Sequence, residues 1–235
     1  VYKRQTQDYE STFAGAYGSA SLGEAGSLVV FGFLNTDGRE DNGSEVTVGS
    51  LWRGEAGPVD LRLEGSLQRG ERNGTDVSAY MVGVRAGGDL SEKVNATLWF
   101  DHLSGDSDPD DAEIGVFNTL FATNHAFYGS ADYFLNIPVH TGGLGLQDAA
   151  LKFRFNLSPE AILRVDLHIF RTAQEGDLST RALANELDLS LTKRLFDGLS
   201  ALAGYSFVQA RDGIRELGRL DENAHWMFVM LDASF

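Results

Sequence analysis

Apolar residues alternate with polar or small ones along most of this sequence. In the clearest segment, 161–171, every second residue from Leu163 to Ile169 is aliphatic, and Arg164 and Asp166 lie between them. Because successive side chains of a strand point to opposite faces, this segment has one apolar and one charged face. A helix instead repeats its apolar residues every three or four positions. The alternation therefore predicts β-strands whose polar face carries charges in mid-strand.

The same alternation predicts about thirteen strands, most of them roughly eight to thirteen residues long. We expect them at 12–20, 27–35, 45–53, 58–69, 76–87, 93–104, 116–122, 128–135, 145–157, 161–171, 182–193, 198–209 and 223–235. Many exceed the about five or six residues usual in soluble sheets and approach the about nine to eleven that a tilted strand needs to cross a bilayer. No stretch approaches the about 18 consecutive apolar residues of a transmembrane helix, so a membrane crossing has to use strands.

Short and long connections alternate between these predicted strands. The short ones are 21–26, 54–57, 88–92, 158–160 and 194–197, and the long polar ones are 36–44, 104–115, 172–181 and 210–222. Outer-membrane barrels have short periplasmic turns and longer extracellular loops. The fold class we expect is therefore all-β, an antiparallel up-and-down transmembrane β-barrel. A soluble β-sandwich is the alternative fold.

Composition narrows the function classes without deciding the fold. The chain is 43% hydrophobic and 23% charged, which also suits a soluble domain. Its net charge of -15 argues against a nucleic-acid partner, because phosphate binding depends on Lys and Arg. The absence of Cys excludes disulfides, thiolate nucleophiles and Cys-ligated metals.

Aromatic residues lie towards the ends of many predicted strands. Transmembrane barrels carry aromatic girdles at the two membrane interfaces. The candidates for these girdles are Phe31, Phe33, Trp52, Tyr80, Trp99, Phe100, Phe153, Phe155, Tyr205, Phe207, Trp226 and Phe235.

The two ends of the chain carry expectations of their own. Residues 1–5 resemble translated sequencing adapter, so we expect them to be non-native and 6–235 to be the C-terminal portion of one barrel domain. No signal peptide precedes the strands, and we expect one in the precursor. Phe235 follows Ala233 and Leu231 at alternate positions, which resembles the terminal strand that the barrel assembly machinery recognises.

The run 117–129, continued by residues 132–134, resembles a signature of the alginate export family of outer-membrane proteins. The matching residues are His125, Tyr128, Gly129, Asp132 and Phe134. Two later segments, 185–189 and 204–207, are similar to family members in the same order. The resemblance implies a barrel of about eighteen strands in a Gram-negative outer membrane, of which this chain holds the later part. It also implies a pore for a polyanionic polysaccharide, with a lumen lined by Arg and Lys.

Charged residues of the predicted strands are the candidates for the lumen. They are Arg62, Arg85, Lys152, Arg154, Arg164, Arg171, Asp166, Glu186 and Asp188. Basic groups at a constriction select anions, because a narrow pore focuses their field. Acidic groups on the same face leave a second interpretation open, in which the charges pair across strands and hold the register.

Catalytic and metal sites have weak support. No two of the five His have the spacing of a strand or helix metal pair. We expect His125 to bond to Asp132 or to a backbone carbonyl and so fix an inward-folded turn. Glu186 and Asp188 imitate a catalytic pair, yet nothing around them indicates a cleft, so we predict neither an enzyme nor a cofactor. One acidic loop offers hard oxygen ligands for Ca²⁺, with a merely solvated loop as the alternative: Asp106, Asp108, Asp110 and Asp111.

The function expected from these features is a channel that passes an alginate-like polysaccharide or small solutes by passive diffusion. A general porin without saccharide preference and a structural or adhesive barrel remain as alternatives. The expected partners are outer-membrane lipid, the barrel assembly machinery and the transported solute.

Overall fold

The computed structural model describes residues 11–38 and 43–234, which form one twelve-stranded sheet. Eleven strands follow one another in chain order as antiparallel neighbours, and β7 pairs with β5 alongside this path. The strands are β1 (Thr12–Ser21), β2 (Ser27–Thr36), β3 (Ser44–Ala56), β4 (Val59–Arg72), β5 (Thr75–Ser91), β6 (Val94–Leu103), β7 (Glu113–Ile114), β8 (Leu146–Ser158), β9 (Ala161–Arg171), β10 (Ala182–Phe196), β11 (Leu199–Ala210) and β12 (Ala224–Ala233). The expected up-and-down antiparallel order is confirmed.

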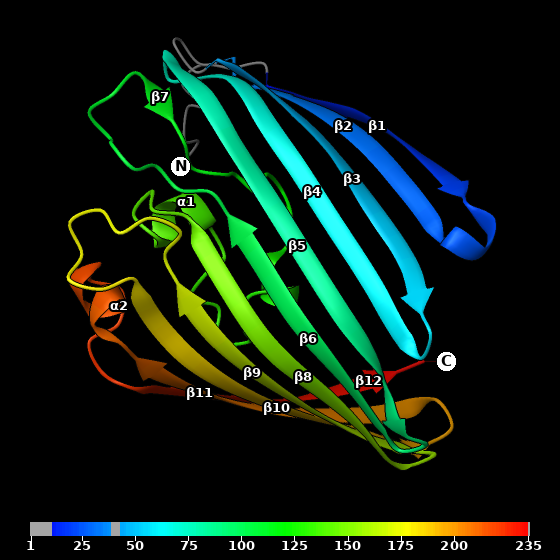
Figure 1. Ribbon diagram of the computed structural model, residues 1–235. Helices are drawn as coiled ribbons and strands as arrows, with labels where there is room; N and C mark the ends of the chain where they lie inside the picture. The colour runs from blue at the N-terminus through cyan, green and yellow to red at the C-terminus, as the bar shows by residue number, and fades with distance from the viewer. Residues whose placement is uncertain (1–10, 39–42, 235) are drawn as a thin grey trace, which may run out of the picture.

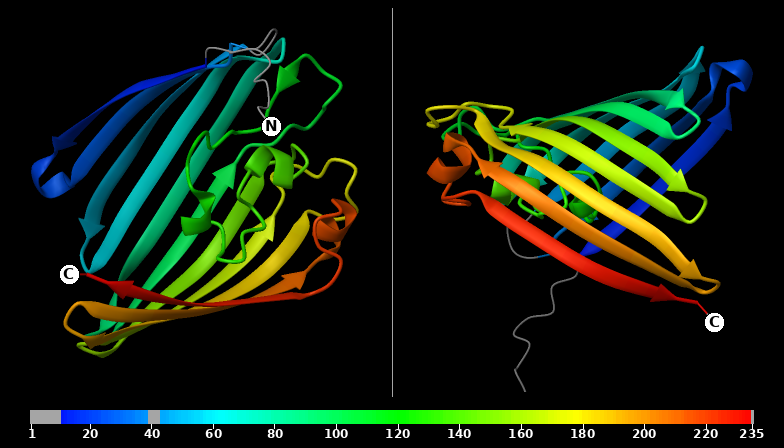
Figure 2. Two further views of the ribbon diagram at one scale, coloured as in Figure 1. Left: turned by 180° about the vertical axis from the view of Figure 1, so that it is seen from behind. Right: turned by 90° about the horizontal axis from the view of Figure 1, so that it is seen from below.

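The sheet curves around a concave side, with short turns at one end and long connections at the other (Figures 1 and 2). The chain between β6 and β8 folds into the concave side, where α1 (Ile137–His140) lies. In the described part of the chain, β1 and β12 each pair with a single neighbour. No helix in that part is long and apolar enough to cross a membrane.

The convex face of the sheet is apolar. In β10, Leu187, Leu189 and Leu191 alternate with Glu186 and Asp188 and occupy the other face. The same alternation leaves large apolar side chains exposed on strand after strand: Val46, Val48, Leu63, Leu67, Val82, Val84, Leu98, Phe100, Leu167, Ile169, Leu191, Met227, Val229 and Leu231. The leucine-rich faces are therefore not packed into a dry core, and they form the surface that faces lipid in a membrane barrel.

Two of the predicted strands, 116–122 and 128–135, are wrong. This region is a connection that contains the 3₁₀ helix η2 (Asn124–Ala126). Its alternating apolar residues imitate a strand, but the left-handed φ angles of Leu120 (55°), Gly129 (81°) and Asp132 (64°) interrupt any extended ladder.

One turn departs from the expected alternation of short and long connections. Asn73 and Gly74 join β4 to β5 at the end where the long loops lie. Both have positive φ, 52° and 77°, which suits the tightest hairpin turns.

The inward-folded connection packs a dry cluster against the inner faces of β5, β6 and β8–β11. Phe134 and Phe170 lie at its centre, with ring centroids 4.5 Å apart. Ile214, from α2 (Asp212–Glu216), covers the cluster from a neighbouring loop. Its other buried members include Val77, Leu103, Phe117, Tyr128, Ile137, Leu146, Leu183 and Val208. The open space of the concave side is thereby displaced towards β1–β5.

Candidate functional site

Three arginines stand side by side on the concave face near the short-turn end. Arg53 of β3 is in register with Arg62 of β4, and Arg62 with Arg85 of β5. Like charges directly opposite each other destabilise a sheet. Their arrangement is therefore unfavourable for the stability of the sheet. We call these three residues the arginine row.

The arginine row is only partly neutralised by its neighbours. Arg62 Nη2 donates to Glu64 Oε2 at 2.7 Å, and Arg85 Nη2 lies 3.4 Å from Asp101 Oδ2. The guanidinium carbon of Arg85 lies 3.4 Å from the ring centroid of Trp99, a cation–π contact. Within the described ranges, the Arg53 side chain has no ion-pair partner, and the buried Nε–H groups of Arg62 and Arg85 donate no hydrogen bond to the protein. The Arg53 guanidinium, which lines the cavity described next, therefore keeps donor groups for a ligand.

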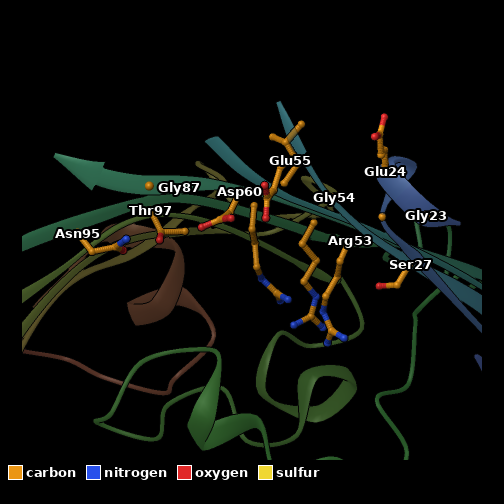
Figure 3. Close-up of a pocket in the computed structure, with 15 residues that line it drawn as sticks. Gly23, Glu24, Ser27, Arg53, Gly54, Glu55, Asp60, Gly87, Asn95 and Thr97 are labelled. Atoms are coloured by element: carbon orange, nitrogen blue, oxygen red, sulfur yellow. The ribbon is translucent and has the colours of Figure 1, made fainter. Parts of the chain in front are cut away.

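The arginine row lines a cavity of about 560 Å³. Figure 3 shows Arg53 directed to the interior, whereas Glu24 points the opposite way. Polar residues complete the wall, among them Ser27, Asn95 and Thr97. Glu55 and Asp60 also line it and are paired across β3 and β4, so the wall carries mixed charge with the arginines in one row.

Further basic residues lie on the concave faces of β8 and β9. Arg154 and Arg164 are opposite each other, a second like-charge pair. Lys152 Nζ donates to Asp166 Oδ2 at 3.0 Å, and it lies 3.2 Å from Nε2 of His168. Arg154 also lines a cavity of about 460 Å³ with Lys93 at the short-turn end. Basic groups thus border the concave side on β3–β5 and again on β8–β9.

The structure divides the charged residues predicted for the lumen. It places Arg62, Arg85, Lys152, Arg154, Arg164, Asp166, Glu186 and Asp188 on concave positions. Arg171 is the exception and needs correction: it alternates with the concave set, shares the convex positions of Leu167 and Ile169, and is exposed at the loop end of β9. Every second residue from Arg164 through Asp166 points to the concave side, and Arg171 is not in that series.

Sequence reasoning missed Arg53 as a site residue. Its signal was present, because Glu45, Thr47, Gly49 and Leu51 precede it on the same face, but apolar Leu51 obscured the alternation. The girdle prediction also needs correction at four residues. Phe31, Phe33, Trp99 and Trp226 occupy concave positions, in register with other inward residues.

The inward connection is held at two walls of the sheet. At β4, Gln68 Nε2 donates to the Asn118 carbonyl at 2.7 Å, and the Asn118 N–H donates to Gln68 Oε1 at 2.8 Å. At β10, the N–H of Ala131 donates to Glu186 Oε1 at 2.8 Å, and the N–H of Ser130 donates to Asp188 Oδ2 at 3.2 Å. The connection therefore spans the concave side as a strap, and Glu186 and Asp188 hold it. We call residues 116–134 the strap.

The residues of the family-like motif all lie in this strap. His125 Nδ1 is 2.5 Å from Asp132 Oδ1, which is one of the two contacts expected for it. Tyr128 and Phe134 are buried in the dry cluster. Gly129 lies so close to Glu186 that an added Cβ would stand 2.4 Å from Oε2. The motif thus specifies how the strap folds and where it binds the sheet.

The carboxylates of the acidic loop proposed for Ca²⁺ accept hydrogen bonds from the backbone of the same loop. Asp106 Oδ1 accepts from the N–H of Asp108, and Asp108 Oδ1 from that of Asp110. Asp111 Oδ1 accepts from the N–H of Glu113. Over residues 11–38 and 43–234, no three carboxylate or imidazole groups gather as a metal site requires. Residues 1–5 and Phe235 lie outside the described residues.

Comparisons with known proteins give a family and two solved structures. The model of a family described as alginate export matches residues 3–193. The NanC porin, solved in a rhombohedral crystal form, is 10% identical over 96% of this chain and 99% of its own, with a TM-score of 0.48. The KdgM porin is 7% identical over 97% and 95%, with a TM-score of 0.41. No curated protein matches the chain.

Proposed function

The chain belongs to the alginate export family, and on that premise we propose that it passes an acidic, alginate-like polysaccharide by passive diffusion. It is an outer-membrane channel of Gram-negative bacteria, with an antiparallel barrel-type sheet. We assign it transport and no catalysis. Its convex face contacts lipid, and the barrel assembly machinery is the partner that would insert it.

The arginine row carries this proposal. A guanidinium group binds a carboxylate through two parallel hydrogen bonds, and a uronate residue offers one carboxylate per sugar ring. Arg53, Arg62 and Arg85 lie on three neighbouring strands, so the wall offers three adjacent guanidinium groups to the carboxylates of one saccharide. Conduction requires such binding, which is strong enough for entry and shared over several sites for release.

The strap contributes by narrowing the passage. It fills the concave side against β5–β11, so a solute has to pass close to β1–β5, where the arginine row lies. A narrower passage also strengthens the field of the arginines, because less water screens them. The strap and the arginine row therefore act on the same part of the path.

The test is ion conductance of the complete channel protein in planar bilayers. Oligouronates added on one side are expected to block the current, and neutral oligosaccharides of equal length are not. Arg53→Gln is expected to weaken the block by about tenfold, since a hydrogen bond to a charged group contributes about 1.5–3 kcal/mol. Arg69→Gln is the matched control, because Arg69 lies on the convex face of β4.

A current that is indifferent to oligouronates would overturn the saccharide claim and leave a general porin. That second function would show the same conductance with either sugar and no response to Arg53→Gln.

A further inference from the structure

Aromatic rings line the concave face next to the arginine row. Phe31 and Phe33 of β2 have ring centroids 5.4 Å apart. Phe13 of β1 stacks on Phe33 at 5.6 Å, and Phe121 of the strap packs edge-on against Phe13 at 4.9 Å. Phe13 and Phe121 are 49% and 73% exposed. Rings on this face contact the wet interior and not lipid. Contact with lipid therefore does not explain why they are aromatic. We call Phe13, Phe31 and Phe33 the aromatic wall.

Two glycines let these rings lie against the sheet. A Cβ on Gly15 would stand 2.3 Å from Cδ1 of Phe33, and a Cβ on Gly49 would stand 2.4 Å from Cζ of Phe31. Each ring therefore covers the backbone of a neighbouring strand at a position where any other residue would displace it. With one side against the sheet, the ring turns its other side to the interior.

The aromatic wall and the arginine row meet at a second cavity. This cavity has a volume of about 200 Å³ and is lined by Phe31 and Phe33 together with Phe127 of the strap. Arg62 and Arg85 line both this cavity and the larger one. The volume of the smaller cavity lies below the about 300–1,000 Å³ of sites for drug-sized ligands, so it can take only a small part of a saccharide.

We propose that the aromatic wall is a stacking subsite for the sugar ring of an acidic saccharide whose carboxylate is held by the arginine row. A pyranose ring has an apolar C–H face and a polar edge, so it matches a flat apolar surface next to cations. The proposal rests on the proposed function and adds ring recognition to charge recognition. A chain of carboxylates without sugar rings would use the arginines alone.

The alternative explanation is purely structural, because aromatic side chains that cover strand glycines stabilise sheets. Loss of that cover would disturb every ligand alike. Loss of a stacking subsite would weaken the binding of sugars and leave other polyanions unaffected. The two explanations therefore differ in ligand dependence.

The experiment compares two blockers of the complete channel protein in planar bilayers: oligouronate, and oligoglutamate with the same number of carboxylates. Phe31→Leu and Phe33→Leu keep an apolar side chain and remove the flat ring. Each is expected to weaken the oligouronate block by about 3- to 10-fold and to leave the oligoglutamate block unchanged. Phe33→Tyr is expected to restore the wild-type block. Phe153→Leu is the matched control, since Phe153 lies on the convex face.

The outcomes separate this inference from the proposed function. If wild-type protein is blocked by neither polyanion, the proposed function fails. The stacking subsite is wrong if oligouronate blocks the Phe→Leu variants as strongly as it blocks the wild-type protein. It is also wrong if the variants are blocked less by oligouronate and less by oligoglutamate to the same extent. Should a Phe→Leu variant fail to assemble, Gly15→Ala decides, because its new Cβ must displace the ring of Phe33. The same selective loss is then expected.

Discussion

At the scale of single residues, the charges on the concave face divide into two groups. Glu186 and Asp188 are bound to the strap and are structural. Arg53 is in register with Arg62 and Arg62 with Arg85, and these three are the residues proposed to bind the solute. The sequence predicts the face of most charged residues, because alternation fixes it. It cannot predict which carboxylates meet a loop residue more than fifty positions away, since that contact depends on how the strap folds.

Gly129 is the residue on which the strap depends most closely. Its φ is 81°, and an added Cβ would meet the buried carboxylate of Glu186. Gly129→Ala should therefore cost more than the about 1–2 kcal/mol of the left-handed backbone alone. Urea unfolding in lipid vesicles measures the loss. Gly143→Ala is the control, because Gly143 has a φ of 82° and open space around it. Equal losses in the two variants would contradict the contact.

A pH-dependent link joins two loops at the long-loop end. The Ser179 hydroxyl and N–H donate to Glu216 and lower the pKa of its carboxyl from the ordinary 4.5. Since the folded pKa is the lower one, the link is fully present above the unfolded value and is lost as the pH falls through the folded pKa. We expect hydrogen-exchange protection of the Ser179 amide to fall in that acidic range.

Two controls belong to this pH experiment. The Ala182 amide donates to the Thr180 hydroxyl, which does not titrate, so its protection is expected to stay constant. Glu216→Gln is expected to remove the pH dependence at Ser179. Parallel behaviour of the two amides would show that the whole loop opens and that Glu216 is not the cause.

At the scale of elements, the long strands follow from the sequence and the strap does not. Predicted and observed strands agree closely at 161–171, 182–196 and 199–210. The sequence pattern predicts two strands in the strap because its apolar residues also alternate. Their partners are the inner faces of β5–β11 and not a neighbouring ladder. A local sequence pattern predicts that a residue is buried, but it does not predict which residues pack against it.

Gln68 is the anchor of the strap at β4, where it is fully buried. Gln68→Ala removes both of its hydrogen bonds to the backbone of Asn118, which costs about 1–3 kcal/mol for each buried group left unpaired. The strap should then move more freely, and single-channel recordings should show added open-state current noise. Gln147→Ala is the control, because Gln147 lies on the convex face with His102. A quiet current in Gln68→Ala would show that the anchor at β10 suffices.

At the scale of the whole molecule, the sheet has one apolar and one charged face, as the alternation predicts. The sequence predicts this division well, because a membrane barrel repeats one rule on every strand. It predicts the interior poorly, since the dry cluster joins residues from Val77 to Ile214 that no local pattern relates.

The two edges of the sheet determine how the 235-residue chain behaves alone. In its described part, β1 and β12 are each paired on one side only, and unpaired backbone groups are costly in lipid. We expect this chain, refolded in detergent, to give a heterogeneous product without the heat-dependent gel mobility of a closed barrel. Gel electrophoresis with and without boiling is the measurement. A monodisperse, heat-modifiable species would contradict the expectation.

The division into a lipid face and a wet interior is the central claim, and cysteine scanning along β10 tests it most directly. The 235-residue chain has no Cys, so an introduced thiol is unique within it. In the complete channel protein in vesicles, a water-soluble maleimide should label Ser190→Cys and Thr192→Cys. It should not label Leu189→Cys or Leu191→Cys. A fluorescent label attached at either leucine position by a membrane-permeant reagent should instead be quenched by spin-labelled lipid. Labelling of the leucine positions together with protection of positions 190 and 192 would contradict the account.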